Sequence, residues 1–274
     1  MTEPAPAAVE FSHVSLAFDE RVVLDDLSFS IPKGGMRILF GVSGSGKSVL
    51  LKLILGLLRP DSGAVLVNGE RVDTMDEHDL LRVRSGIGMV FQENALFDSL
   101  TVSENVGYQL HEQHRMTKDE ARARVEEVLA FIGLSEFIDR LPSELSGGQR
   151  RRVAIARAMA SDPPLLLFDD PITGLDPMIA KTVDNEILKL RDLEHVTALV
   201  VTHQIRDAFY IATHQAVRTN GKMEFVAADP ARAGQIEFMV LHDGRIQFHG
   251  PAAELLASQD PYLKNYLLNT LPPW

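Results

Sequence analysis

The sequence predicts an α/β fold with a parallel sheet at its centre. Three apolar segments, Met36 to Phe40, Leu165 to Asp169 and Thr197 to His203, have the length and composition of buried strands. Segments with helical patterns lie between them, and Asp176-Pro177 marks one helix start, with a capping residue before a proline at the first helical position. Buried strands that alternate with helices are typical of a parallel sheet covered by helices.

The composition limits the classes of function that the chain can have. Its 27 basic and 38 acidic residues give a net charge of −11, which argues against nucleic acid and anionic lipid surfaces as partners. We therefore expect the run Arg150 to Arg152 to form salt bridges on a helix face. The absence of cysteine excludes disulfide scaffolds and cysteine nucleophiles. No charge-free apolar stretch reaches the roughly 18 residues of a membrane helix and no secretory signal is found, so we expect a cytoplasmic chain without a membrane span.

Strand-rich and helix-rich regions follow one another along the chain. After a mobile leader at residues 1–8, alternating apolar residues predict strands, and Asn68-Gly69 predicts a hairpin turn. Residues 93–160 have helical patterns instead. The segments Thr101 to Glu104 and Thr117 to Glu120 both have the form of a capping box at a helix start. The sequence therefore predicts a helical insertion between strand-rich parts.

A phosphate-binding loop is predicted at Gly41 to Ser48, which fits the pattern G-x-x-x-x-G-K-[ST] between a strand and a helix. Its glycines allow backbone N–H groups to turn towards phosphates, and the helix N-terminus adds partial positive charge. Lys47 can reach the β- and γ-phosphates of a nucleotide, and Ser48 can coordinate magnesium. The strand that ends at Asp169 can place a carboxylate beside that ion. Together these segments predict a Mg²⁺-nucleotide site.

A third motif lies in the helical insertion, where Leu145 to Gln149 read Leu-Ser-Gly-Gly-Gln. With this pentapeptide the sequence resembles the ATP-binding-cassette (ABC) ATPases from about Val9 to Gly250. The resemblance implies the ABC ATPase form of the P-loop NTPase fold, with a mixed sheet core, an antiparallel β subdomain and an inserted helical subdomain. It also implies ATP and Mg²⁺ as ligands and a head-to-tail homodimer. In such a dimer the pentapeptide, called the signature, of one subunit closes on the γ-phosphate held by the other.

The resemblance also assigns roles to single residues. Four are implied to take part in hydrolysis: Lys47, Gln92, Asp170 and His203. Three are implied to bind the metal: Ser48, Gln92 and Asp169. Those implied to bind the nucleotide, within one subunit or across the dimer, are Phe18, Gly41, Ser43, Gly44, Ser45, Gly46, Lys47, Ser48, Val49, Ser146, Gly147, Gly148, Gln149 and Asp176. In family terms, Phe18 stacks on adenine, Gln92 is the Q-loop glutamine, Asp176 belongs to the D-loop and His203 is the switch histidine.

Asp170 departs from the family pattern, which usually has a glutamate that polarises the attacking water. Aspartate keeps the charge but retracts the carboxylate by about one carbon–carbon bond, and a displacement of about 1 Å can lower a rate on the order of 100-fold. We expect the site still to hydrolyse ATP, because the other catalytic residues are present and catalysis depends mostly on positioning and charge. The alternative is a slowly hydrolysing subunit that ATP switches.

Two further segments, residues 219–238 and residues 251–274, lie outside the motifs of the family. Residues 219–238 intervene before the last family segment, and the turn signal at Asn220-Gly221 predicts an extra hairpin. That hairpin is either a surface excursion or a contact with another subunit. Residues 251–274 form a tail with too many apolar side chains to be left in water. We expect one helix there, packed on its own domain or on the opposite ATPase.

Local segments also resemble the ATPases of mammalian-cell-entry (MCE) lipid transporters of the Mla type; they are Gly46 to Lys52, Ala95 to Val102, Leu141 to Gly148 and Ala257 to Leu267. The resemblance implies two ATPase copies beneath an integral membrane permease, at the cytoplasmic face of the inner membrane, with an MCE-domain substrate-binding protein as a further partner. The implied cargo is phospholipid or another hydrophobic molecule. The same catalytic residues suit the ATPase of a polar-solute importer, such as one for amino acids, so that alternative stays open.

Overall fold

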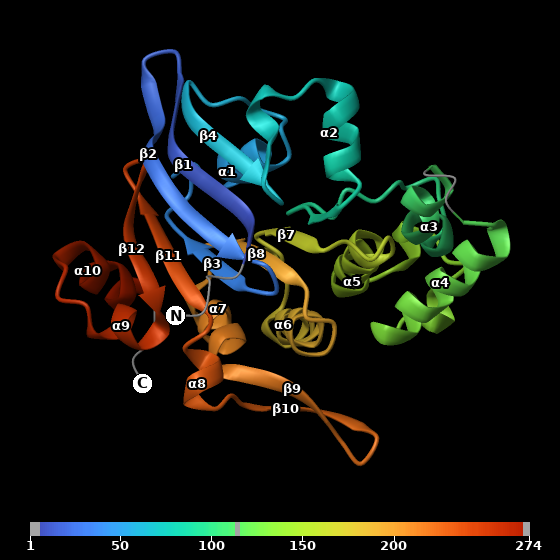
Figure 1. Cartoon of the computed structure of the whole chain (residues 1–274). Helices are drawn as coiled ribbons and strands as arrows, with labels where there is room; N and C mark the ends of the chain where they lie inside the picture. The colour runs from blue at the N-terminus through green and yellow to red at the C-terminus, as the bar shows by residue number, and fades with distance from the viewer. Residues whose placement is uncertain (1–5, 113–115, 271–274) are drawn as a thin grey trace.

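The central layer of the molecule is a six-stranded mixed sheet (Figure 1). The computed structural model describes residues 6–112 and 116–270; residues 1–5 and 271–274, the outer parts of the expected leader and tail, lie outside the described residues. The strand order is β12-β11-β3-β8-β7-β6, and every neighbouring pair is parallel except β11 and β12. The strands span Met36–Phe40 (β3), Ile87–Val90 (β6), Leu165–Asp169 (β7), Thr197–Thr202 (β8), Glu237–His242 (β11) and Arg245–Pro251 (β12).

A second, antiparallel sheet has the order β2-β1-β4-β5. Its strands span Ala7–Phe18 (β1), Arg21–Pro32 (β2), Ser62–Val67 (β4) and Glu70–Arg71 (β5). The turn after β4 is Asn68-Gly69, and φ values of 51° and 83° give it the left-handed conformation that this pair favours. Apolar side chains of this sheet, of α1 (Lys47–Ile54) and of one face of the central sheet form a shared core. Because β1 begins at Ala7, the expected leader is shorter than residues 1–8.

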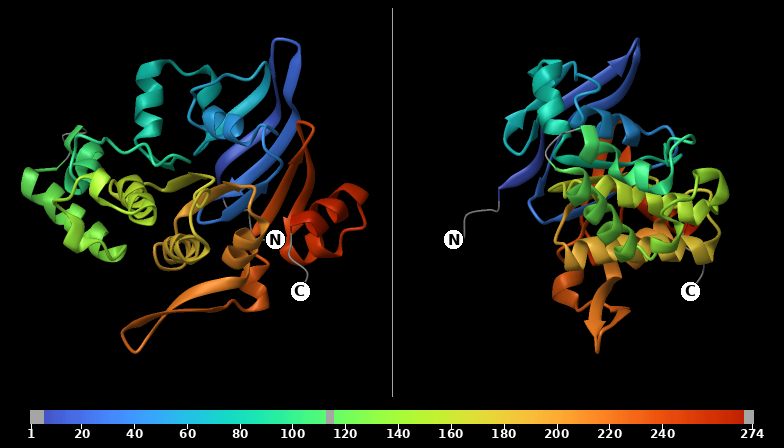
Figure 2. Two further views of the ribbon diagram at one scale, coloured as in Figure 1. Left: turned by 180° about the vertical axis from the view of Figure 1, so that it is seen from behind. Right: turned by 90° about the vertical axis from the view of Figure 1, so that its right-hand side faces the viewer.

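Helices cover the other face of the central sheet and form the insertion at one side of it (Figures 1 and 2). They span Val102–Glu112 (α3), Lys118–Phe131 (α4), Gly147–Met159 (α5), Pro177–Leu193 (α6) and Ile205–Thr213 (α7). The helix Glu77–Arg84 (α2) instead packs Leu80 into the core that contains α1. Both expected capping boxes are present: Thr101 and Glu104 exchange hydrogen bonds before α3, and Thr117 and Glu120 do so at α4. Within residues 6–112 and 116–270, no helix is both long and apolar enough to cross a bilayer.

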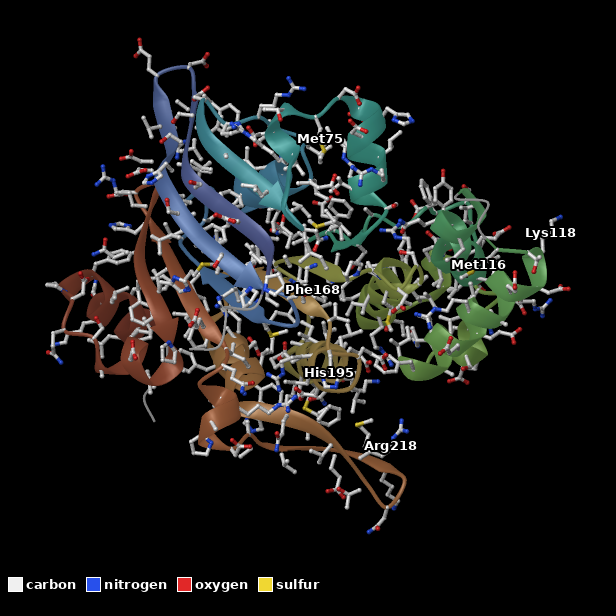
Figure 3. The ribbon with its side chains drawn as sticks, viewed as in Figure 1. Met75, Met116, Lys118, Phe168, His195 and Arg218 are labelled. Carbon is white, nitrogen blue, oxygen red and sulfur yellow. The ribbon has the colours of Figure 1, made fainter. Side chains whose placement is uncertain are left out.

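A two-stranded hairpin, β9 (His214–Thr219) and β10 (Lys222–Ala227), projects from the body of the protein (Figure 2). The sequence predicts a hairpin over 219–238, whereas the observed one begins earlier, since His214 to Thr219 pair with β10 and not with the central sheet. Its turn is Asn220-Gly221, with positive φ at both residues. The short helix α8 (Pro230–Ala233) then leads to β11. Figure 3 shows Arg218 on the hairpin, away from Phe168 in the centre of the molecule.

Charged side chains fix the base of the hairpin to the end of α6. Arg191 donates to the carbonyl oxygen of His214 at 2.6 Å and forms an ion pair with Asp192. The Asp192 carboxylate accepts from the backbone N–H of Ala216 at 2.7 Å and from Arg232, which follows the hairpin, at 2.7 Å. The hairpin is therefore held at its base while its tip extends into solvent.

The tail forms two short helices, α9 (Ala252–Ala257) and α10 (Pro261–Thr270), where the sequence predicts one. The helices are separate because the Asp260 carboxylate accepts from the backbone N–H of Leu263 at 3.0 Å, which starts a new helix. Leu255 and Leu263 are buried in the core that α7 shares. The tail thus packs on its own domain, as one of the two expectations states.

A buried carboxyl group lies where α6 meets α7. Asp184 of α6 has no exposed surface, and burial, reinforced by the negative charge of Asp207, raises its pKa to about 8. Lys181 and Arg206 oppose this shift but do not cancel it. In the unfolded chain an aspartate titrates near about 4. The folded protein therefore keeps Asp184 protonated at neutral pH, where the unfolded chain has released that proton.

This difference predicts a loss of stability as pH rises. Between about pH 4 and pH 8 the native state binds the extra proton, so the free energy of unfolding falls with rising pH across that window. In Asp184→Asn this contribution is absent, so its melting temperature relative to the wild type should increase by several degrees from pH 5 to pH 9. Thermal unfolding at a series of pH values measures this. The exposed Asp98→Asn serves as control, and a constant difference across pH would contradict the assignment.

Candidate active site

Four central strands, β3, β6, β7 and β8, end at one edge of the sheet, and the candidate catalytic residues lie at that edge. The register pairs Phe40 of β3 with Thr202 of β8, and Asp169 of β7 with Val201 of β8. Because parallel strands end together, the loops after β3, β6, β7 and β8 lie side by side. These loops carry the phosphate-binding pattern, Gln92, Asp170 and His203.

The phosphate-binding loop has a backbone that requires its glycines. Gly44 and Gly46 have φ values of 79° and 103°, which favour glycine. A Cβ atom on Gly41 would lie 2.5 Å from the Ser45 hydroxyl and 2.8 Å from a backbone oxygen of β11. Lys47 is only 6% exposed, and its Nζ donates to the carbonyl oxygens of Gly41 and Val42 at 2.8 and 3.0 Å. The amine thus lies over the loop, although burial lowers its pKa.

Two oxygen ligands suited to magnesium meet beside this loop. The Ser48 hydroxyl donates to Oδ1 of Asp169 at 3.1 Å, so helix α1 and strand β7 bring them together. Burial raises the pKa of Asp169, and the nearby charge of Asp170 adds to this effect. Hydroxyl and carboxylate oxygens are ligands that Mg²⁺ prefers, and a divalent cation would relieve the cost of burying this carboxylate. The donor set therefore fits Mg²⁺, which when bound neutralises charge on the phosphates.

Asp170 and His203 form a direct contact between β7 and β8. Oδ1 of Asp170 accepts from the backbone N–H of His203 at 3.0 Å and lies 2.8 Å from the ring Nδ1. Asp170 is 8% exposed, and its backbone has a positive φ of 45°. Its own N–H donates to the carbonyl oxygen of Val201 at 2.8 Å. Both the carboxylate and the imidazole are therefore oriented by the sheet before any nucleotide arrives.

Most of the expected site residues line one cavity of about 380 Å³. Its lining residues are Phe18, Arg21, Val23, Ser43, Gly44, Gly46, Lys47, Ser48, Val49, Gln92, Asp170 and His203. Gly41, Ser45 and Asp169 do not line the cavity: Gly41 packs on Ser45 within the phosphate-binding loop, and Asp169 accepts from Ser48. Arg21 and Val23 also line the cavity, although no sequence motif marks them. They lie there because β2 passes next to the phosphate-binding loop, with Val23 close to Gly46.

The signature and the D-loop residue lie elsewhere. Ser146 caps α5 and exchanges hydrogen bonds with Gln149, while Gly148 packs so closely on Ile179 that a Cβ atom would lie 2.1 Å away. The Asp176 carboxylate caps α6 by accepting from the N–H of Met178 at 2.9 Å. Neither Ser146 to Gln149 nor Asp176 is among the residues that line the cavity. One copy of the chain thus does not bring all the expected nucleotide-binding residues together.

The arginines that follow the signature do not form the expected salt bridges. Arg150 donates to the carbonyl oxygen of Leu145, Arg152 to that of Ile132, and Arg151 to those of Phe91 and Gln92. The guanidinium groups lie next to backbone segments outside the helix. Carbonyl oxygens there need hydrogen-bond donors and accept from the arginines instead. Burial lowers the pKa of Arg151 to about 10, so it stays protonated at neutral pH.

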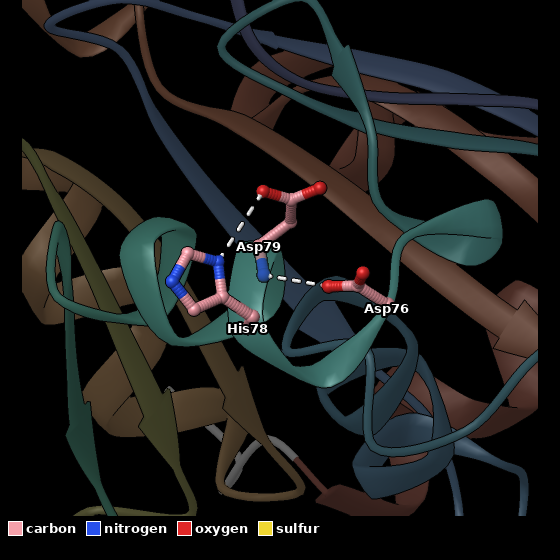
Figure 4. Close-up of side chains that lie close together, drawn as sticks. All are labelled: Asp76, His78 and Asp79. Carbon is pink, nitrogen blue, oxygen red and sulfur yellow. Dashed lines mark hydrogen bonds and ion pairs between the residues drawn. The ribbon is translucent and has the colours of Figure 1, made fainter.

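A cluster of two aspartates and one histidine lies on the surface, away from this site. Asp76, His78 and Asp79 place ligand atoms within 4.8 Å of one another, and all three are exposed (Figure 4). Oδ1 of Asp76 accepts from the N–H of Asp79 at 2.9 Å and thereby caps α2. Helix capping accounts for this arrangement.

Comparison with known proteins identifies the family. The family model described as ABC transporter matches residues 24–173. The sulfate/thiosulfate import ATP-binding protein CysA of Synechococcus elongatus is 41% identical over 83% of this chain, which spans 64% of that relative's length. The intermembrane phospholipid transport system ATP-binding protein MlaF of Escherichia coli is 33% identical over 97% of this chain and 91% of its own length.

Solved structures agree with this result and confirm the expected fold class. The dimeric, post-hydrolysis ATP-binding cassette MJ0796, bound to ADP and Pi, has a TM-score of 0.73 and 30% identity, over 89% of this chain and 98% of its own. CbiO1 from Clostridium perfringens, at 24% identity, has the same fold with a TM-score of 0.76, over 96% of this chain and 95% of its own. The chain therefore belongs to the ABC transporter family.

Proposed function

We propose that the chain is the motor subunit of a membrane transporter and that it hydrolyses ATP with Mg²⁺ at the cavity beside the phosphate-binding loop. The observation that carries this proposal is the convergence of Lys47, Gln92, Asp170 and His203 on one cavity, next to the Ser48–Asp169 pair. These groups come from four separate strand ends, and each has the chemistry that phosphoryl transfer needs.

Positioning and charge carry the reaction in this proposal. Lys47 exchanges its two carbonyl partners for the β- and γ-phosphates and stabilises the charge that develops on them. Ser48, Asp169 and Gln92 would hold Mg²⁺, which would neutralise charge on the phosphates. Asp170 accepts a hydrogen bond from the attacking water and polarises it, and His203 keeps that carboxylate in place. The ring of Phe18, half exposed at the cavity rim, stacks on the adenine.

Two copies of the chain complete each site in this proposal. The signature opens α5 with two small residues, so its helix N-terminus presents backbone N–H groups suited to a phosphate. Because it lies outside the cavity of its own chain, it serves the γ-phosphate of a second copy in a head-to-tail dimer, with Asp176 in the same interface. The dimeric cassette among the similar structures supports this arrangement.

A permease contacts the exposed aromatic surface beside Gln92. Phe91, Phe97 and Tyr108 are all partly exposed, and the rings of Phe97 and Tyr108 lie 4.7 Å apart. Clustered exposed aromatic rings are typical of protein interaction sites. This contact would hold the chain at the cytoplasmic face of the inner membrane as a peripheral subunit.

We favour phospholipid or another hydrophobic molecule as the cargo, with an MCE-domain protein as a further partner. The similarity to MlaF extends over 97% of this chain and 91% of that relative's length. A second candidate is the import of a polar solute such as sulfate, which the higher identity of CysA favours. The cargo is bound by other subunits, so the two candidates share one catalytic site.

Substitution of Asp170 tests its catalytic role. In Asp170→Asn the carboxylate charge that polarises water is lost, so kcat for ATP should fall on the order of 100-fold with little change in KM. Asp170→Glu, which restores the longer side chain, should retain turnover. Steady-state ATPase assays measure both variants. If Asp170→Asn hydrolyses ATP as fast as the wild type, the assignment is wrong.

Mixing two inactive variants tests the head-to-tail dimer. Lys47→Ala removes the phosphate-binding amine, and Gly147→Asp places a negative charge in the signature, where a new Cβ has room because its nearest neighbour lies 3.7 Å away. Each variant alone should be inactive, but an equimolar mixture should regain part of the wild-type ATPase activity, because one site per mixed dimer is intact. A chain with both substitutions is the control. Absence of recovery in a mixture that still dimerises would contradict the arrangement.

Purification from native membranes distinguishes the two cargo candidates. We expect the tagged chain in mild detergent to co-elute with a permease, an MCE-domain protein and phospholipid, identified by mass spectrometry. A permease with a receptor for a soluble solute would move the assignment to the importer. If no membrane protein co-elutes, the transport proposal fails.

A further inference from the structure

The segment between β6 and α3, residues 91–101, has no regular secondary structure yet connects Gln92 to the exposed aromatic surface. We call it the Q-loop segment. Only a few backbone hydrogen bonds stabilise it internally, such as those from Asn94 to Phe91 and from Leu100 to Phe97. Its carbonyl groups are instead bound by side chains of the helical insertion. The path of this loop is therefore set by helices that follow it in the sequence.

Arg151 binds the catalytic end of the Q-loop segment. It lies on α5, five residues after Ser146, and is 2% exposed. One guanidinium nitrogen donates to the carbonyl oxygen of Phe91 and the other to that of Gln92, both at 2.5 Å. A planar guanidinium can bind two neighbouring carbonyls at once, which a lysine ammonium cannot do with the same geometry. This fork fixes the backbone from which the Gln92 side chain extends into the ATP cavity.

Two more side chains hold the rest of the segment. Arg157, also on α5, donates to the carbonyl oxygens of Asn94 and Ala95 at 2.9 and 2.5 Å, and both residues have positive φ values that non-glycine residues rarely adopt. The fully buried Asn105 of α3 accepts from the N–H of Phe97 and donates to its carbonyl oxygen. The segment is thus attached to the helical insertion at its beginning, middle and end.

We propose that Arg151 is a positioning residue for ATP hydrolysis, which sets the place of Gln92 at the Mg²⁺ and phosphate site from the helix that carries the signature. The inference rests on the proposed function, since it assigns Gln92 a part in hydrolysis. Arg151 does not itself line the cavity. It acts through the backbone of Gln92, so the signature helix and the Q-loop glutamine of one chain move as a single unit. A shift of α5 would therefore be transmitted to the catalytic site of the same chain.

A double-mutant cycle in the full-length chain tests this role. The variants are Arg151→Gln, Gln92→Ala and the combination of both, with kcat and KM for Mg²⁺-ATP as the readouts. Misplacement of Gln92 should lower kcat of Arg151→Gln about 10-fold or more, with KM within about twofold of wild type. In the Gln92→Ala background the same substitution should change kcat less than about twofold, because the group that Arg151 positions is already absent. Arg151→Lys should retain an intermediate rate.

Arg152→Gln is the matched control, since Arg152 neighbours Arg151 on the same helix but donates to Ile132, away from the Q-loop segment. Its kcat should equal that of the wild type. If Arg151→Gln fails to fold, Arg151→Lys takes its place in the cycle, because it keeps the buried positive charge. Equal loss of kcat in both backgrounds, or no loss in the wild-type background, would overturn the inference. A wild type that does not hydrolyse ATP would overturn the proposed function itself.

Discussion

Hydrogen bonding between the parallel strands β3, β8, β7 and β6 is the constraint on which the site depends. Those strands come from distant parts of the chain, and none of the loops that follow them could form the cavity alone. The register places Asp169 opposite Val201, so the carboxylates of Asp169 and Asp170 arrive next to Ser48 and His203. Apolar side chains fill both faces of the sheet, and this packing keeps the strand ends fixed relative to one another. The chemistry at the edge is therefore a consequence of core packing.

The parts that could be predicted from sequence are those with local signals. The phosphate-binding loop needs glycines at fixed positions, buried strands are continuous apolar runs, and capping boxes are visible as paired residues such as Thr117 and Glu120. The sequence could place Gln92, Asp170 and His203 near one edge of the sheet because each of them follows closely after the end of a strand. Arg21 and Val23 had no such signal, because only the path of β2 in space brings them to the loop.

Other features depend on partners that sequence spacing does not reveal. The three arginines after the signature looked like a charged helix face, but their partners are carbonyl groups up to 60 positions away. The start of the hairpin at His214 depends on Asp192 and Arg191, which bind its backbone from the end of α6. The break between α9 and α10 depends on the Asp260 carboxylate, which ends an otherwise continuous apolar pattern. In each case polar side chains bind backbone groups that need hydrogen-bond partners.

Arg151 links the signature helix α5 to two residues of the candidate site, Asp170 and Gln92. The guanidinium of Arg151 stays charged at neutral pH although burial lowers its pKa, and the charge of Asp170 opposes that lowering. The same arginine therefore interacts with the charge of the Asp170 carboxylate while it binds the backbone of Gln92. If α5 shifted, the charge of Arg151 near Asp170 and the backbone of Gln92 that Arg151 binds would shift together. In the proposed head-to-tail dimer, the signature at the start of α5 contacts the nucleotide of the second copy, so closure of that dimer would act on the same helix that carries Arg151. In that dimer the position of Gln92 in one chain would depend on contact with the other chain. The two ATP sites would then be coupled through α5 and Arg151 alone.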